Sequence, residues 1–181
     1  MSILTYPAFL ATFLSMVGLT YLAWREHNPE KPRTLSELAA SNRRLVNYFR
    51  IVLWVCGTLF AITMFSYIVP KVIYGFYQLV AWVIYYGCEI LLGIFPARGT
   101  IERLLHNIFS YTMGSAMLAT TFLFAIEFHG IFAIIESILT IIIAVLGTLA
   151  IFDRKRFIFY ELPFIFLSHA SIITAIYALG S

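Results

Sequence analysis

Charged residues are scarce in this sequence. Asp, Glu, Lys and Arg make up 12% of its 181 residues, whereas 61% are hydrophobic. The apolar residues form unbroken blocks, which is typical of membrane proteins and excludes an ordinary soluble domain. The formal charge of +3 comes from Lys and Arg in the connections between these blocks, where orientation in the bilayer explains them. We therefore expect membrane lipids as partners and no nucleic acid.

Cysteine is rare as well, because Cys56 and Cys88 are the only two and each lies within an apolar segment. The sequence contains no CxxC, HxxxH or HExxH spacing, so it offers neither a disulfide framework nor a specific metal motif. We predict that both cysteines are small buried hydrophobic residues. We also predict that the protein uses no metal and no other cofactor.

The lengths of the apolar blocks predict a single all-α domain, residues 1–181. A transmembrane helix needs about 20 apolar residues, and prolines, glycines and charged clusters divide the chain into six such segments. The predicted spans are 3–24, 47–69, 72–95, 104–126, 130–152 and 157–179. The first has neither the positive segment nor the cleavage site of a signal peptide, so we expect it to be retained.

The connection between the first two spans is the only long one. Pro29 and Pro32 keep its first part extended, and Thr34 followed by Glu37 forms a capping box that opens a helix. We predict that this helix begins at Leu35, lies at the membrane interface and bends into the second span. The fold class is therefore an integral membrane bundle of six transmembrane helices with one interfacial helix.

Positive residues are distributed unevenly over the connections. Eleven Lys and Arg residues lie in or beside the first, third and fifth loops, and only Lys71 lies in the second and fourth. Because Lys and Arg accumulate on the cytoplasmic side, the sequence predicts that both termini face away from the cytoplasm. We expect the plasma membrane as the location.

Ionisable residues inside the predicted spans form two groups. A charged side chain at the centre of a bilayer costs at least ~2.5 kcal/mol, so we expect these residues to face the bundle interior. The inner group, near the cytoplasmic boundary, is Glu89, His106 and Glu161; the outer group is a predicted polar pair, Glu136 and His169. The third span also has a polar and aromatic stripe on one helical face: Gln78, Trp82, Tyr85 and Glu89.

Several interpretations of these groups remain open. Two carboxylates near a histidine could act as acid and base, hold a metal ion or relay protons. The candidate catalytic residues are Glu37, Glu89, His106 and Glu161. The structural alternative is that His106 caps a loop while both inner glutamates pair with edge arginines: Arg98, Arg103 or Arg156. The outer pair could be ionic, or neutral and hydrogen-bonded.

Small residues recur at helical spacing in the later spans: Ser110 with Gly114, Ser115 with Ala119, and Ala144 with Thr148. Pairs of this kind commonly allow two transmembrane helices to approach closely. We predict that they serve helix packing and do not bind a ligand.

Two short motifs carry a resemblance to a known family. The segment from Arg25 through Thr34-Leu-Ser-Glu37, and Gly93-Ile-Phe-Pro96 ahead of His106, resemble the hallmarks of six-helix prokaryotic membrane proteins of unknown function. These proteins are allied to the DRAM-like group, which includes autophagy modulators and GPI-anchor lipid-remodelling factors. The hallmark positions that match are Ser36, Glu37, Pro96 and His106.

This chain departs from the family pattern at several positions. Ala39 stands where the pattern prefers glycine, Leu35 where it prefers isoleucine, and Ala97 where an aspartate often follows Phe-Pro. The resemblance implies six helices and a role related to membranes or lipids, and it supplies no established reaction.

We weigh three functions from these observations. The first is a non-catalytic component that modulates lipids or a partner, which could be another membrane protein or a second copy of the chain. The second is an enzyme that acts on lipid headgroups at the cytoplasmic face. The third is a proton or ion pathway through Glu161, His169 and Glu136.

Overall fold

The computed structural model describes residues 2–26, 34–40, 42–96, 99–153 and 156–181. Over these ranges the chain contains helices and turns and no strand. The α-helices are α1 (Tyr6–Glu26), α2 (Leu35–Ala40), α3 (Arg43–Thr63), α4 (Gly75–Ile94), α5 (Thr100–Glu127), α6 (Gly130–Phe152) and α7 (Phe157–Gly180). A 3-10 turn, η1 (Ile3–Thr5), precedes α1, and a π-helix, η2 (Met64–Ile68), and a second 3-10 turn, η3 (Val69–Lys71), follow α3.

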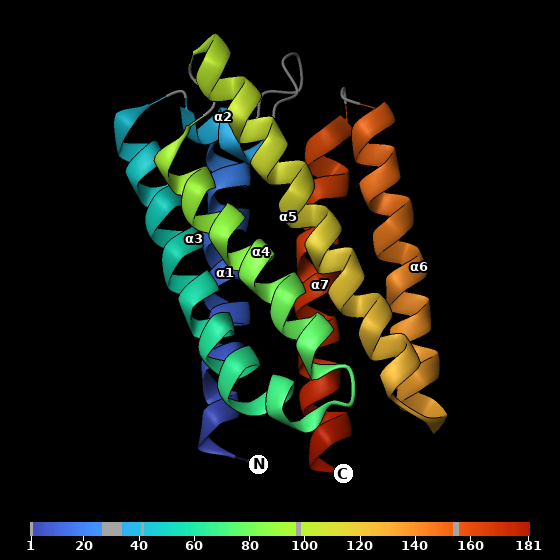
Figure 1. Ribbon diagram of the computed structural model, residues 1–181. Coiled ribbons are helices and arrows are strands. Elements are labelled where there is room, and N and C mark those ends of the chain that lie inside the picture. The colour runs from blue at the N-terminus through green and yellow to red at the C-terminus, as the bar shows by residue number, and fades with distance from the viewer. Residues whose placement is uncertain (1, 27–33, 41, 97–98, 154–155) are drawn as a thin grey trace.

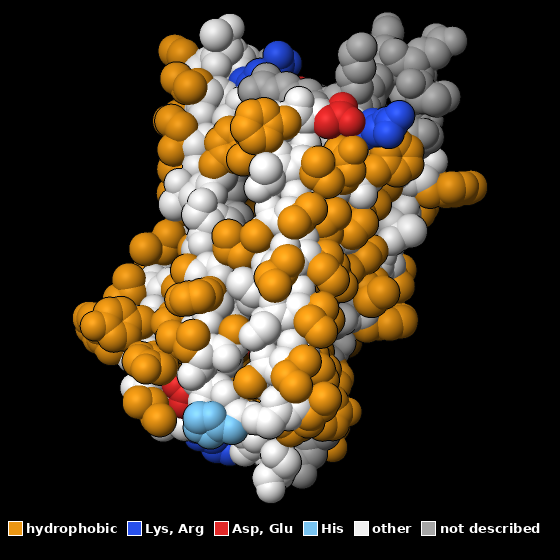
Figure 2. All heavy atoms as spheres, turned by 90° about the vertical axis from the view of Figure 1, so that its right-hand side faces the viewer, with side chains coloured by type: hydrophobic (Ala, Val, Ile, Leu, Met, Phe, Trp, Pro, Cys, Tyr) orange, Lys and Arg blue, Asp and Glu red, His pale blue; other side chains and the backbone are white. Residues whose placement is uncertain are grey.

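Six helical segments in the described part of the chain are long and apolar enough to cross a membrane. They run from Ile3 to Arg25, Arg43 to Lys71, Gly75 to Ile94, Thr100 to Glu127, Gly130 to Phe152 and Phe157 to Gly180. The predicted fold class, a bundle of six transmembrane helices, is confirmed. Figure 2 shows the expected surface, with hydrophobic side chains over the middle of the face and charged side chains near its two ends.

The long helices lie side by side, and α2 sits at one end of the bundle (Figure 1). Both termini lie at the opposite end (Figure 1). Consecutive long helices contact one another, and α7 also packs against α1, so the first and last spans are neighbours. Helix α2 packs against α1 and α3, and its first turn also reaches α7, where it contributes to the site described below.

The structure corrects the prediction of one helix running from the interface into the second span. The interfacial helix α2 ends at Ala40, and α3 begins separately at Arg43. Asn42 is the reason, because its extended backbone stops the first helix and its side chain accepts a 2.8 Å hydrogen bond from the Arg44 N–H. Asparagine at this position satisfies a backbone donor that the new helix leaves without a partner.

The turn between α3 and α4 lies where Pro70 and Lys71 predict it, and a carboxylate from α5 holds it in place. The backbone N–H groups of Ile73 and Tyr74 donate to the two carboxylate oxygens of Glu127, at 2.7 and 3.1 Å. These N–H groups stand just before α4, where a helix cannot satisfy its own donors. Glu127 therefore links the second predicted loop to the end of α5.

The buried side chains form two clusters. The larger one fills the middle of the bundle around Phe60, Trp82 and Phe124, whose exposed fractions are 1%, 0% and 0%. The smaller one joins Leu35 and Leu38 of α2 to leucines of α1 and to Ile158 of α7. Thus α2 is packed into the end of the bundle rather than lying loosely on its surface.

Candidate functional site

The first turn of α2 is held by the capping box that the sequence predicts. The Glu37 N–H donates to Thr34 Oγ1 at 3.1 Å, and the Thr34 N–H donates to Glu37 Oε2 at 3.2 Å. Ser36 joins this turn through a 2.8 Å hydrogen bond between its hydroxyl and that of Thr34. Glu37 is therefore engaged in maintaining the local structure of α2.

Glu161 connects α2 to the last helix. Its Oε2 accepts a 2.9 Å hydrogen bond from the backbone N–H of Leu35, which lies 126 residues earlier in the chain. The first N–H groups of any helix need an external acceptor, and a carboxylate makes a strong one. Among the described residues the partner of Glu161 is this backbone N–H, and no ion pair joins it to Arg103 or Arg156. The third arginine predicted as its partner, Arg98, lies outside the described residues.

His106 anchors the end of α4. Its Nδ1 lies 2.9 Å from the carbonyl oxygen of Phe95, and only 4% of the residue is exposed. A carbonyl can only accept, so Nδ1 carries the proton, and in the neutral ring Nε2 is left as an acceptor. The predicted role of His106 as a cap for this loop is confirmed.

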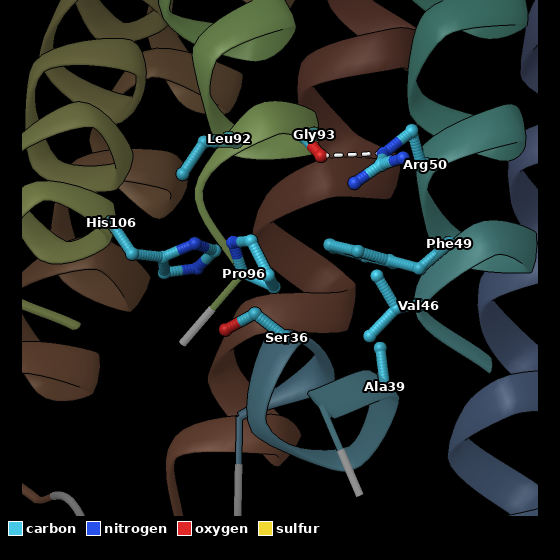
Figure 3. A pocket seen from close by; sticks show the side chains of 9 residues that line it. All are labelled: Ser36, Ala39, Val46, Phe49, Arg50, Leu92, Gly93, Pro96 and His106. Carbon is cyan, nitrogen blue, oxygen red and sulfur yellow. Dashed lines mark hydrogen bonds between the residues drawn. The ribbon is translucent and has the colours of Figure 1, made fainter. Parts of the chain in front are cut away.

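The hallmark positions Ser36, Pro96 and His106 meet at a small hollow between α2, α3 and the end of α4. Figure 3 shows the side chains of Ser36 and His106 converging on Pro96 from two different helices. The hollow measures about 10 Å³, which is close to the least volume that one water molecule needs. By itself it is too small for a substrate.

A much larger cavity, of about 300 Å³, lies next to this hollow. It is enclosed mainly by α5, α6 and α7, with further walls from α1, α2, α3 and α4. Most of its walls are apolar, including Leu53, Leu118 and Ile165. Its polar lining residues near α2 are Ser36, His106, Ser110 and Glu161. The cavity thus combines an apolar body with a polar end.

The small residues of α5 and α6 help to create this space. Gly114, Ala144, Gly147 and Thr148 line the cavity. A Cβ atom on Gly114 or Gly147 would lie 3.7 or 3.4 Å from the ring of Phe164 on α7. The expectation that such residues serve only close helix packing is therefore incomplete, since here they also make room for a cavity and for an aromatic ring.

Glu89 lies apart from the other candidate catalytic residues. It is 4% exposed, its carboxylate lies against Gly57 of α3, and its Oε2 has no hydrogen-bond partner. It lines neither the small hollow nor the large cavity. The predicted edge arginine does not pair with it in the described part of the chain. Of the four candidates, the structure brings together Glu37, His106 and Glu161 around α2 and leaves Glu89 separate.

The outer residues Glu136 and His169 also have different partners. Glu136 Oε2 accepts a 2.5 Å hydrogen bond from the hydroxyl of Ser171, whereas the His169 ring lies 4.5 Å from that of Phe60 on α3. His169 and Ser171 are two positions apart on α7, so they point to nearly opposite sides of the helix. Among the described residues, no hydrogen bond or ion pair joins Glu136 to His169.

The sequence did not reveal how α3 holds the end of α4. The Arg50 Nε donates to the Gly93 carbonyl at 2.6 Å, and the Trp54 Nε1 donates to the Ile90 carbonyl at 3.3 Å (Figure 3 shows the arginine). A Cβ atom on Gly93 would overlap the Trp54 ring. Arg50 and Trp54 are one helical turn apart and so share a face of α3, which is the only signal of these contacts that the sequence carries.

The described residues include no group of three or more His, Cys, Asp or Glu side chains arranged to hold a metal ion. The polar end of the large cavity instead presents hydrogen-bonding groups in an apolar surrounding, an arrangement typical of sites for small organic molecules. Comparison of the chain with family models, with curated proteins and with solved structures gave no match.

Proposed function

We propose that this protein is a non-catalytic, multi-pass membrane protein that binds one amphipathic lipid in the large cavity. The observation that carries the proposal is the cavity itself, about 300 Å³ in volume, apolar along α5, α6 and α7 and polar beside α2. This volume falls at the lower end of the range for small-molecule sites. A membrane lipid has the matching division into an apolar chain and a polar end.

The position of the cavity supports entry from the bilayer. Its lining includes Tyr111 and Ser115 of α5 and Thr148 and Ile151 of α6, all of which are exposed on the outer surface of the bundle. In Figure 1, α5 tilts away from α6 toward the end where α2 lies. A lipid chain can therefore enter sideways between these two helices.

A non-catalytic role is favoured because the candidate catalytic groups have structural tasks. Glu37 closes the capping box, Glu161 accepts from Leu35, and His106 holds the Phe95 carbonyl. The headgroup enzyme that we weighed would also need Glu89, which lies outside the cavity. The separation of Glu136 from His169 likewise gives no support to a proton pathway through them.

Kinship with the DRAM-like group also remains a proposal. It is supported by the meeting of Ser36, Pro96 and His106 at one hollow, because these hallmark positions come from three separate parts of the chain. A lipid-related role agrees with what that resemblance implies.

Filling the cavity tests the proposed function. Ala144→Phe places a ring in the space between α5 and α6, whereas Ala119→Phe adds the same ring to an exposed position of α5 that does not line the cavity. Native mass spectrometry of protein extracted with membrane lipid should show a retained lipid in the natural chain and in Ala119→Phe, and loss of that lipid in Ala144→Phe. Equal lipid retention in both variants would refute the proposal.

A further inference from the structure

The hydrogen-bonding groups at the polar end of the cavity indicate which class of lipid it takes. We infer that the ligand is a single-chain amphiphile whose polar end donates hydrogen bonds, through a hydroxyl or an amine, and is not a phosphate. This inference rests on the proposed function, and it specifies the ligand of the same site.

Of the four polar side chains at this end of the cavity, Glu161 and His106 offer free acceptors, and the hydroxyls of Ser36 and Ser110 can accept as well as donate. A carboxylate has more acceptor positions than one N–H can fill, so Glu161 retains acceptor capacity after binding Leu35. The His106 Nδ1–H is used by Phe95, which leaves Nε2 as an acceptor in the neutral ring. A hydroxyl or ammonium group complements this pair of acceptors.

The charge of the site opposes an anionic headgroup. Glu37 and Glu161 bind the successive N–H groups of Thr34 and Leu35, so their carboxylates lie near one another at the same helix end. Among the described residues, no Lys or Arg lines the cavity itself, and Arg50, which lines the adjoining hollow, donates to the Gly93 carbonyl. A phosphate here would face carboxylates in a low-dielectric setting, where like charges repel strongly, and would lack the bidentate arginine that such groups favour.

The size of the cavity limits the number of chains. Its volume of about 300 Å³ is twice the roughly 150 Å³ of an engineered cavity that binds benzene. This is room for one apolar chain inside the cavity, so any second chain would have to lie outside it. Leu118 and Ile143, which lie far along their helices from α2, mark the region where the chain would end.

Three probes with the same dodecyl-length chain distinguish the headgroups: monododecanoylglycerol, dodecylamine and dodecanoyl lysophosphatidic acid. Binding of each to the purified full-length protein is measured by native mass spectrometry, with Ala144→Phe as the measure of binding outside the cavity. We expect the glycerol and amine probes to bind at least about tenfold more tightly than the phosphate probe, as one hydrogen bond to a charged group allows.

Glu161→Gln tests the acceptor directly. Glutamine can still accept from the Leu35 N–H, but it then directs an N–H₂ donor toward the cavity. Affinity for the amine probe should fall about tenfold, and the preference over the phosphate probe should shrink. Glu136→Gln is the matched control, because Glu136 is a buried carboxylate that does not line the cavity.

The outcomes separate the two proposals. Equal binding of all three probes that Ala144→Phe abolishes would overturn the headgroup inference and leave the lipid site in place, as would tightest binding of the phosphate probe. Binding that Ala144→Phe does not change, or no binding of any probe, would overturn the proposed function itself.

Discussion

At the scale of single residues, several polar side chains at the helix ends satisfy backbone groups. Glu161 and His106 each bond to the backbone at a helix end, and Arg50 and Glu127 do the same elsewhere. An unsatisfied N–H or carbonyl within a membrane costs several kcal/mol, so a side chain that reaches one is retained for stability. Glu161 and His106 can bind a ligand only through the acceptor positions that these backbone hydrogen bonds leave free.

Replacement of Glu161 separates the loss of the acceptor from the loss of charge. Glu161→Ala leaves the Leu35 N–H without its partner, and we expect the free energy of unfolding to fall by about 1–3 kcal/mol. Glu161→Gln keeps an acceptor at the same position and should retain most of that stability. Thermal unfolding in detergent measures both variants, and an equal loss in the two would show that the hydrogen bond is not the cause.

The buried residues also show what could not be predicted from composition. The sequence located Glu136 and His169 inside the membrane and suggested that they pair. It could not show that Ser171, two positions away, would take Glu136 as its acceptor while His169 turned to Phe60. Which face of α7 meets α6 is set by packing of the whole bundle, and no local pattern records it.

At the scale of elements, the sequence predicted where helices begin better than it predicted which distant residues contact them. Thr34 and Glu37 predict the start of α2, and the structure has the predicted capping box. The expected continuous helix into the second span was wrong because Asn42 competes as a cap for α3. The attachment of α2 to Glu161 bridges 126 residues and has no local signal.

Two glycines of α4, one at its first residue and one in its interior, allow a matched pair of substitutions. A Cβ atom on Gly75 would lie 2.5 Å from the backbone carbonyl of Val69, whereas one on Gly87 would meet nothing within 4 Å. Both glycines belong to α4. We expect Gly75→Ala to destabilise the protein by about 1–3 kcal/mol, because the backbone must shift to avoid overpacking.

Gly87→Ala should be neutral or stabilising by up to about 1 kcal/mol, since alanine is the better helix former. Thermal unfolding of the two variants side by side checks the contrast. A similar effect of both substitutions would show that the close contact at Gly75 does not limit the turn.

At the scale of the whole molecule, the six spans could be predicted from the sequence. The length of the apolar segments, their composition and the prolines, glycines and charged clusters between them all indicate the same six helices. The cavity did not follow, because it arises where α5 tilts away from α6 and no single helix encodes that angle. Small residues such as Gly114 and Ala144 were visible, but in sequence they are equally consistent with close packing.

The two ends of the bundle should face different compartments. In the described part of the chain, Lys71 lies at the same end of the bundle as both termini, and six arginines lie at or near helix ends on the side of α2: Arg25, Arg43, Arg44, Arg50, Arg103 and Arg156. From the positive-inside rule we predict that α2 lies at the cytoplasmic face. If the C-terminus faces away from the cytoplasm, alkaline phosphatase fused after Ser181 should be active and green fluorescent protein fused there should not fluoresce.

A fusion after Asp153, at the end of α6, is the control and should give the reverse pattern of reporter activity. A bright fluorescent protein after Ser181 would contradict this orientation and would move the polar end of the cavity to the outer face.

The bond between Glu161 and Leu35 has a consequence for biosynthesis. Leu35 emerges from the ribosome early, while its acceptor belongs to the last span and is made 126 residues later. Helix α2 can pack against α1 and α3 as soon as these are inserted, but the Leu35 N–H gains its acceptor only after α7 has entered the bilayer. Formation of this hydrogen bond is therefore a late event in assembly, and a chain truncated before Phe157 would leave the first N–H of α2 without an acceptor.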